Sequence, residues 1–229
     1  MFKTGITHVF FDLDHTLWDF EKNSELTFAR ILSQNGIETS LDGFMEKYRP
    51  INFAYWKEYR ENRITKAALR YNRLRHTFDA IGIQVNDEII NTLSEEYIGY
   101  LSSFGNLLPQ AKEVLEYLAP KYNLHIITNG FQEIQDKKLK NSGILEFFDV
   151  VVNSEMAGVK KPNPEIFELA LQMASATPSN SVMVGDNLEA DIQGAFNLGL
   201  KTIHLQDSHE PHHDLGKIIN TLGEIKNIL

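Results

Sequence analysis

The segment that most constrains the fold of this chain is residues 9–16, VFFDLDHT, in which an apolar run leads into Asp12 and Asp14. A short, unbroken apolar run is typical of a strand that is buried on both faces of a parallel sheet. Side chains two residues apart lie on the same side of a strand, and open α/β sheets bind their ligands at the carboxyl ends of strands. We therefore expect Asp12 and Asp14 to lie together at a ligand site.

Two carboxylates this close need a counter-charge, because each disfavours the ionised form of the other. Mg²⁺, a hard cation that prefers oxygen ligands, is the natural partner. An Asp-x-Asp pair alone is nevertheless more often a turn or a solvated strand end. The remaining segments of the chain decide between these two interpretations.

The composition is that of a folded, acidic protein. The chain has 229 residues, of which 42% are hydrophobic, and a net charge of −9, so one large domain or a domain with an insert is expected. The acidic balance argues against a nucleic-acid polymer or an anionic membrane as partner, since both need clustered positive charge. The absence of cysteine excludes disulfides, thiolate metal sites and cysteine nucleophiles. No secretion signal or membrane-spanning run is apparent, so we expect a cytoplasmic protein.

Residues 17–103 show helical periodicity and no convincing strand. Thr65 and Asn86 are expected to cap helices, and Gly82 to follow the end of one. Pro50 is expected to break the chain between two apolar stretches. These features predict an all-helical cap domain, inserted after the first strand.

From residue 104 onward, strands alternate with helices, which is the pattern of parallel βαβ units. Strands are expected at residues 124–128, 148–152, 181–185 and 201–205. The last long helix is expected at residues 190–198. The sequence thus predicts an α/β fold, with a Rossmann-like parallel-sheet core formed by residues 1–16 and 104–229 and a helical cap formed by residues 17–103.

Two further strand ends carry groups suited to an anion. Thr128 and Asn129 stand at a turn that enters a helix, where a hydroxyl and free backbone N–H groups form an anion cradle, although a simple helix cap accounts for them equally well. Lys161 precedes Pro162, which holds it extended. Lys161 is a candidate for facing a phosphate, whereas Lys160 is expected to be solvated.

A last strand end carries acids. Asp186 follows the apolar run of residues 182–184 and would add an anionic ligand to the site of Asp12. Asp191 comes five residues later, near a helix start, where interaction with the helix dipole is an alternative explanation for an acid. Four strand ends of one sheet therefore present acids, a hydroxyl and a lysine.

As a set, these segments resemble the haloacid dehalogenase-like hydrolases. The matching motifs, in chain order, are FFDLDHT at residues 10–16, ITNG at 127–130, KPNPEIF at 161–167 and GDNLEAD at 185–191. They span the whole predicted core, and their combination is specific although each one alone is weak. His15 departs from the family, in which this position is often Gly, Asp or Asn.

The resemblance implies a Mg²⁺-dependent phosphomonoesterase that acts through an aspartyl-phosphate. It implies that Asp12 is the nucleophile, that Asp14 is the general acid and base, and that Lys161 neutralises charge on the phosphoryl group. The acid at position 14 favours phosphoryl chemistry, because haloalkanoate dehalogenases of the same superfamily do not need it.

The resemblance also implies the residues that bind. Thr128 and Asn129 would bind the phosphate, and Mg²⁺ would be bound by Asp12, the backbone carbonyl of Asp14, and Asp186. Thr16 and Asp191 would support the site, with Asp191 orienting Lys161 or the water around the metal.

The substrate is suggested by residues 17–20, LWDF, which look like the pyrimidine 5′-nucleotidase branch of the superfamily. Trp18 and Phe20 would then set substrate specificity, since aromatic rings stack on bases. The aromatic residues at helical spacing in the cap are more typical of a packed core; they are Phe53, Trp56 and Tyr59.

The expected partner is therefore a small-molecule phosphomonoester, first of all a pyrimidine nucleoside monophosphate, and the oligomeric state stays open. The alternatives are a sugar-phosphate phosphatase or a phosphomutase of the same superfamily. A non-enzymatic module that binds a phosphorylated ligand is less favoured, since a binder needs no proton donor beside a nucleophile.

Residues 209–213, HEPHH, match no standard metal-site spacing and are expected to form a loop.

Overall fold

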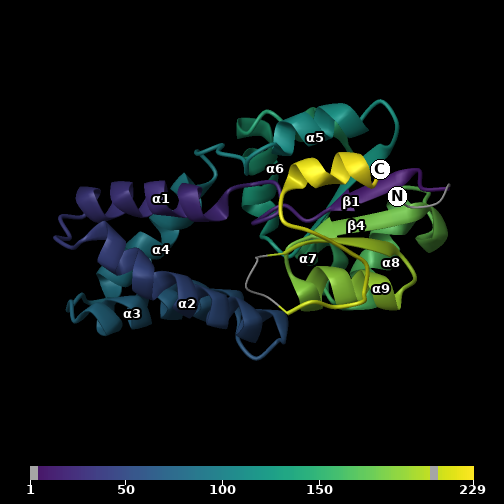
Figure 1. Cartoon of the computed structure of the whole chain (residues 1–229). Coiled ribbons are helices and arrows are strands. Elements are labelled where there is room, and N and C mark those ends of the chain that lie inside the picture. Colours follow the sequence, from purple (N-terminus) through teal and green to yellow (C-terminus); the bar gives the residue numbers. More distant parts are fainter. Residues whose placement is uncertain (1–4, 207–210) are drawn as a thin grey trace. The chain divides into compact units, whose positions relative to one another are not determined.

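A computed structural model describes residues 5–206 and 211–229 of the chain (Figure 1). The chain divides into two compact units. The sheet unit comprises Met1–Phe20 and Gly105–Leu229, and the helical unit comprises Glu21–Phe104.

The sheet unit is built on six parallel strands in the order β3-β2-β1-β4-β5-β6. The strands are β1 (His8–Phe11), β2 (Asn123–Thr128), β3 (Phe148–Asn153), β4 (Ser181–Gly185), β5 (Lys201–Leu205) and β6 (Lys217–Ile219). All four residues of β1 are buried, because the strand pairs with β2 on one side and β4 on the other. The predicted Rossmann-like parallel sheet is confirmed.

Helices cover both faces of this sheet. They are α5 (Ala111–Leu118), α6 (Gln132–Asn141), α7 (Ser154–Ala157), α8 (Pro164–Met173) and α9 (Gly194–Asn197), with short helices η1 (Leu145–Phe147), η2 (Pro178–Asn180), η3 (Leu188–Gln193) and η4 (Leu222–Asn227). Figure 1 shows α5 on one face of the sheet and α8 and α9 on the other. Phe10 and Met183 from neighbouring strands pack with Phe167 of α8 in a fully buried cluster, and this packing fixes the loops at the strand ends.

The helical unit holds most of α1 (Phe20–Gln34), together with α2 (Leu41–Arg60), α3 (Lys66–Ile81) and α4 (Asp87–Leu101). The predicted caps are confirmed. Thr65 Oγ1 accepts a hydrogen bond from the N–H of Ala68, Asn86 caps α4, and Gly82 adopts a left-handed conformation after α3. An aromatic cluster centred on Phe28 forms the core.

Two expectations for the helical unit are wrong. Pro50 lies inside α2, which continues through it. The helix has buried residues on both sides of Pro50, including Tyr48 and Tyr59, so packing offsets the lost backbone hydrogen bond of the proline. Phe53 is not a core residue, since it is 65% exposed.

The predicted helix at residues 190–198 is also divided. One π-helical turn, η3, is followed by the short α9. Asn187 caps this turn by accepting from the N–H of Ala190, and the N–H of Asn187 donates to Oδ2 of Asp191. The π-helical turn thus fixes the Asp191 side chain. A sequence pattern of helical period does not reveal such a turn. Among the described residues, no helix combines the length and apolar composition needed to cross a membrane.

Candidate active site

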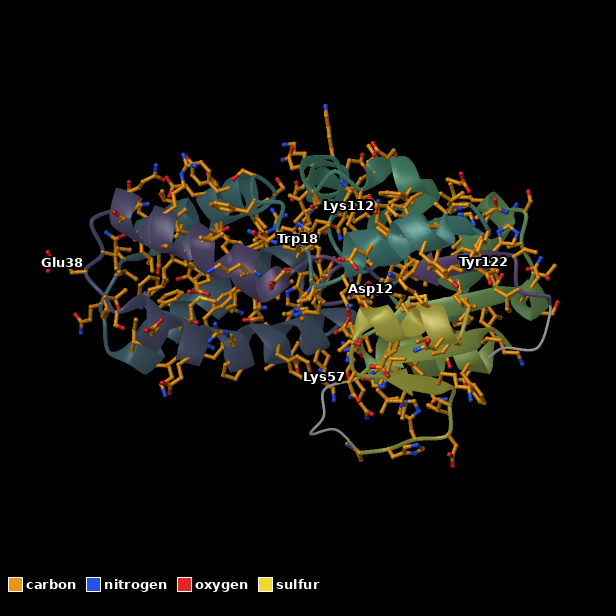
Figure 2. The ribbon with its side chains drawn as sticks, turned by 45° about the horizontal axis from the view of Figure 1, so that its top comes forward. Asp12, Trp18, Glu38, Lys57, Lys112 and Tyr122 are labelled. Carbon is orange, nitrogen blue, oxygen red and sulfur yellow. The ribbon has the colours of Figure 1, made fainter. Side chains whose placement is uncertain are left out.

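The site is built around Asp12, the first residue after β1 (Figure 2). Its backbone N–H donates to the carbonyl of Val184, 2.9 Å away, so the residue continues the pairing of β1 with β4. The order of the strands along the chain reverses between β1 and β4. Such a switch point is where open α/β sheets bind their ligands, and Asp12 is buried there, with 8% of the residue exposed.

Lys161, at the end of the loop before α8, provides the positive charge next to Asp12. Its Nζ lies 2.5 Å from Oδ1 of Asp12, 2.7 Å from Oδ1 of Asp191 and 2.6 Å from the carbonyl of Ile127. Burial works against the charge of Lys161, but the two carboxylates outweigh it and raise the pKa of the ammonium. Lys161 is therefore a fixed, charged anchor.

The side chain of Asn129 holds the backbone of Lys161. Its Nδ2 donates to the Lys161 carbonyl at 3.0 Å, and its Oδ1 accepts from the Lys161 N–H at 2.8 Å. Both polar atoms of the Asn129 side chain are thus used within the protein, so contact of Asn129 with a phosphate would fall to its backbone N–H and stays a prediction. The side chain connects the end of β2 to the loop that carries the lysine.

Three carboxylates gather around this lysine. One oxygen each from Asp12, Asp186 and Asp191 lies within 4.8 Å of the others. Burial, opposed by Lys161 and reinforced by Asp191 and Asp186, raises the pKa of Asp12 well above its ordinary value. Burial and the charge of Asp191 raise the pKa of Asp186 to about 7, although the hydroxyl of Thr16 donates to it at 2.9 Å.

The donor set of this acidic cluster fits a hard divalent cation. Three carboxylates face one ammonium, so the site carries excess negative charge, and all the ligand atoms are oxygens. Asp191 fits a supporting position, since one of its oxygens pairs with Lys161 and the other accepts from Asn187. Gly185 makes room for it, because a Cβ there would overlap the Asp191 carboxylate.

Asp14 has different partners from Asp12. Its Oδ1 lies 2.5 Å from Nζ of Lys138, and its Oδ2 lies 3.4 Å from Nε2 of Gln135. Both partners come from α6 and are about 99% buried. Neither residue is among those that the motifs predict. The available signal was a lysine four residues after Ile134, on the helix face where an apolar residue is expected.

Thr128, at the end of β2, presents its hydroxyl to the same region. Its Oγ1 accepts from the N–H of Gly130 at 3.0 Å and from Nε2 of Gln135 at 2.8 Å. Because two donors occupy the oxygen lone pairs, the hydroxyl hydrogen is left to donate. This arrangement makes Thr128 a donor suited to a phosphoryl oxygen.

Trp18 and Phe20 are not placed as open stacking surfaces. Trp18 is fully buried and Phe20 is 6% exposed, and their ring centroids lie 6.3 Å apart. Nζ of Lys138 lies 4.2 Å from the centroid of the Trp18 ring. The idea that the Trp18 ring stacks on a base is therefore corrected, since its faces are occupied by protein.

The histidine-rich segment lies only partly within the described residues, because His209 and Glu210 fall outside them. His213 Nε2 lies 2.8 Å from Nδ1 of His204, and Nε2 of His204 lies 2.8 Å from the carbonyl of Asp186. His213 thus belongs to a hydrogen-bonded chain that ends on the backbone carbonyl of Asp186, whereas His212 is exposed.

Comparison with known proteins identifies the family of this chain. The haloacid dehalogenase-like hydrolase family matches residues 6–199. Pyrimidine 5′-nucleotidase PynA of Streptococcus pneumoniae is 33% identical over 205 residues, which are 89% of this chain and 83% of PynA. Pyrimidine 5′-nucleotidase YjjG of Escherichia coli is 32% identical over 202 residues, which are 88% of this chain and 86% of YjjG.

Among solved structures, that of YfnB from Bacillus subtilis bound to magnesium is similar over nearly the whole chain. It has a TM-score of 0.88 and 25% identity, and the similarity covers 98% of this chain and 99% of YfnB. The family match at residues 6–199 includes all the strand-end segments that build the site. The chain belongs to the haloacid dehalogenase-like hydrolase family.

Proposed function

We propose that this protein is a Mg²⁺-dependent phosphomonoesterase that acts through an aspartyl-phosphate on Asp12, with pyrimidine nucleoside 5′-monophosphates as its substrates. One observation carries the proposal: Asp12 is paired with Lys161 in an acidic cluster, while Asp14, two residues on, has a separate cationic partner in Lys138. Two neighbouring carboxylates in different environments are suited to different roles.

In the first step, a carboxylate oxygen of Asp12 attacks phosphorus and the bond from phosphorus to the ester oxygen breaks. Lys161 and the Thr128 hydroxyl hold the phosphoryl oxygens, and Asp14 gives its proton to the leaving alcohol. Lys161 also keeps Oδ1 of Asp12 fixed, which leaves the other oxygen to form the new bond. The products of this step are the alcohol and the phosphorylated Asp12.

In the second step, water attacks the phosphorus of the aspartyl-phosphate. Asp14, now a carboxylate, accepts a proton from the water, and the bond from phosphorus to Asp12 breaks to release phosphate. Asp12, Asp186 and the backbone carbonyl of Asp14 would hold Mg²⁺, which would supply positive charge that reduces the repulsion between the substrate and the acidic cluster. Asp191 keeps Lys161 oriented throughout.

The substrate class is supported by the two pyrimidine 5′-nucleotidases, which align with more than four fifths of this chain. The local motif LWDF at residues 17–20 is consistent with that branch. Trp18 and Phe20 contribute to specificity from buried positions, by shaping the loop after Asp14.

The experiment that tests this function is phosphate release from pyrimidine and purine 5′-monophosphates and from sugar phosphates, with Mg²⁺ or with a chelator. We expect Mg²⁺-dependent release, fastest from pyrimidine monophosphates. Asp12→Asn should lose about 10³-fold or more of the activity, while the same substitution at the exposed Asp149 should retain it.

Other outcomes separate the parts of the proposal. Faster release from sugar phosphates would overturn the substrate class but keep the mechanism. Undiminished turnover by Asp12→Asn, or full activity in chelator, would overturn the mechanism. If the wild-type protein binds these esters but releases no phosphate from them, it is a non-enzymatic module that binds a phosphorylated ligand.

A further inference from the structure

A buried lysine outside the four family motifs contacts Asp14. Lys138 of α6 is 1% exposed, and its Nζ lies 2.5 Å from Oδ1 of Asp14. A buried ammonium is costly unless it is paired, so the carboxylate and the lysine stabilise each other in this position. The Asp14 side chain is 21% exposed. This exposure is needed by a group that must reach a ligand.

The lysine is held from its other side by aromatic rings. Its Nζ lies 4.2 Å from the centroid of Trp18 and 5.7 Å from that of Phe20. A cation over an aromatic face is attracted to the ring, more strongly where water is excluded. The loop that carries Asp14 therefore supplies both the carboxylate and the rings that hold Lys138.

Gln135, one helical turn before Lys138, completes the arrangement. Its Nε2 lies 2.8 Å from Oγ1 of Thr128 and 3.4 Å from Oδ2 of Asp14. Gly130 permits this approach, since a Cβ at that position would overlap the Gln135 amide. The two oxygens of Asp14 are thus fixed by two side chains of the same helix, and the carboxylate is oriented from both sides.

We propose that Lys138 is a positioning residue for Asp14. By donating to Oδ1 it orients the carboxyl group so that Oδ2 carries the proton that is transferred to the leaving alcohol. This inference rests on the proposed function and adds to it a residue that contacts no substrate. Lys138 acts only through Asp14, so its contribution depends on how much the reaction needs a proton donor.

The leaving group provides the test. A nucleoside monophosphate releases a strongly basic alkoxide and needs general acid catalysis, which typically contributes 10²- to 10⁴-fold. p-Nitrophenyl phosphate releases a weakly basic phenolate and needs little. We compare kcat/KM for both esters with Mg²⁺, because kcat/KM reports the step in which the leaving group departs. The ratio of the two values is independent of the fraction of folded enzyme.

Lys138→Met keeps the length of the side chain and removes its charge. We expect it to lose about 10- to 100-fold of kcat/KM on the nucleoside monophosphate, and at most a few-fold on p-nitrophenyl phosphate. Lys138→Gln, which retains a donor for Asp14, should show a smaller change of the same kind. Lys137→Met, at an exposed position of the same helix, is the matched control and should leave the ratio unchanged.

A double-mutant cycle separates positioning from packing. In an Asp14→Asn background, Lys138→Met should cause little further loss on the nucleoside monophosphate, because the group that it positions is already disabled. Equal losses on both esters, or an undiminished loss in the Asp14→Asn background, would overturn the positioning role while leaving the phosphatase function intact. Failure of the wild-type protein to hydrolyse either ester would instead overturn the proposed function.

Discussion

At the scale of single residues, His15 shows how the first motif tolerates its departure from the family pattern. Its φ of 64° lies in the left-handed region, and its N–H donates to the carbonyl of Trp18 at 3.0 Å. Gly, Asn and Asp enter this region most readily, and His does so more often than most residues. The family often has Gly, Asp or Asn at position 15. His15 thus satisfies the same requirement for a left-handed backbone as these residue types do.

His15→Val should destabilise the fold by about 1–2 kcal/mol, because a β-branched side chain clashes with the backbone at this φ. His15→Asn should stay near the wild type. Both variants lose the contact of the His15 ring with Phe20, whose centroids lie 4.8 Å apart, so their difference isolates the backbone effect. Urea denaturation measures it, and equal free energies of unfolding for the two variants would contradict the explanation.

At the scale of elements, α2 carries a removable defect. Pro50 lacks the N–H that would bond to the carbonyl of Glu46, and its ring crowds that carbonyl. Pro50 is solvent-exposed, so its removal does not open a cavity. The helix is therefore stabilised by its packing in spite of this residue.

Pro50→Ala should raise the free energy of unfolding by about 1–3 kcal/mol, since it restores a helical hydrogen bond and a strong helix former. Lys47→Ala, at another exposed position of α2, should change it by less than about 0.5 kcal/mol. Thermal and urea unfolding compare the two. A Pro50→Ala protein no more stable than the wild type would show that α2 depends on the proline.

The elements also show what the sequence could predict. Caps such as Thr65 and Asn86 act within a few residues of themselves, and the strand ends at Asp12 and Asp186 follow from short apolar runs. Lys138 reaches Asp14 across 124 positions of the chain, so its role depends on how α6 packs. Local patterns therefore predicted the elements and motifs, whereas contacts between distant elements required the structure.

At the scale of the whole molecule, a buried histidine pair in the sheet links stability to pH. His8 Nδ1 and His125 Nε2 lie 3.0 Å apart on β1 and β2. Burial and the neighbouring His8 lower the pKa of His125 to about 4, although Asp149 opposes this shift. Burial also lowers the pKa of His8, again opposed by the charge of Asp149. Both rings are therefore neutral in the folded sheet.

A depressed histidine pKa means that the unfolded chain takes up protons first. Stability is then fully present above about pH 6.5 and falls as the pH decreases toward 4. His125→Leu should flatten this decline by about 1–2 kcal/mol between pH 7 and pH 5. His212→Leu, which replaces an exposed histidine, should leave the decline unchanged. Urea denaturation over this pH range measures the slope, and an unchanged slope in His125→Leu would argue against the pair.

The central claim is that Asp12 carries the phosphoryl group between substrate and water. The most direct measurement is the stereochemical course at phosphorus, using a substrate made chiral with oxygen isotopes and sulfur and hydrolysed by the Mg²⁺-loaded enzyme. Two successive in-line displacements, first by Asp12 and then by water, predict net retention of configuration. Net inversion would show a single direct attack by water, and would contradict the aspartyl-phosphate mechanism.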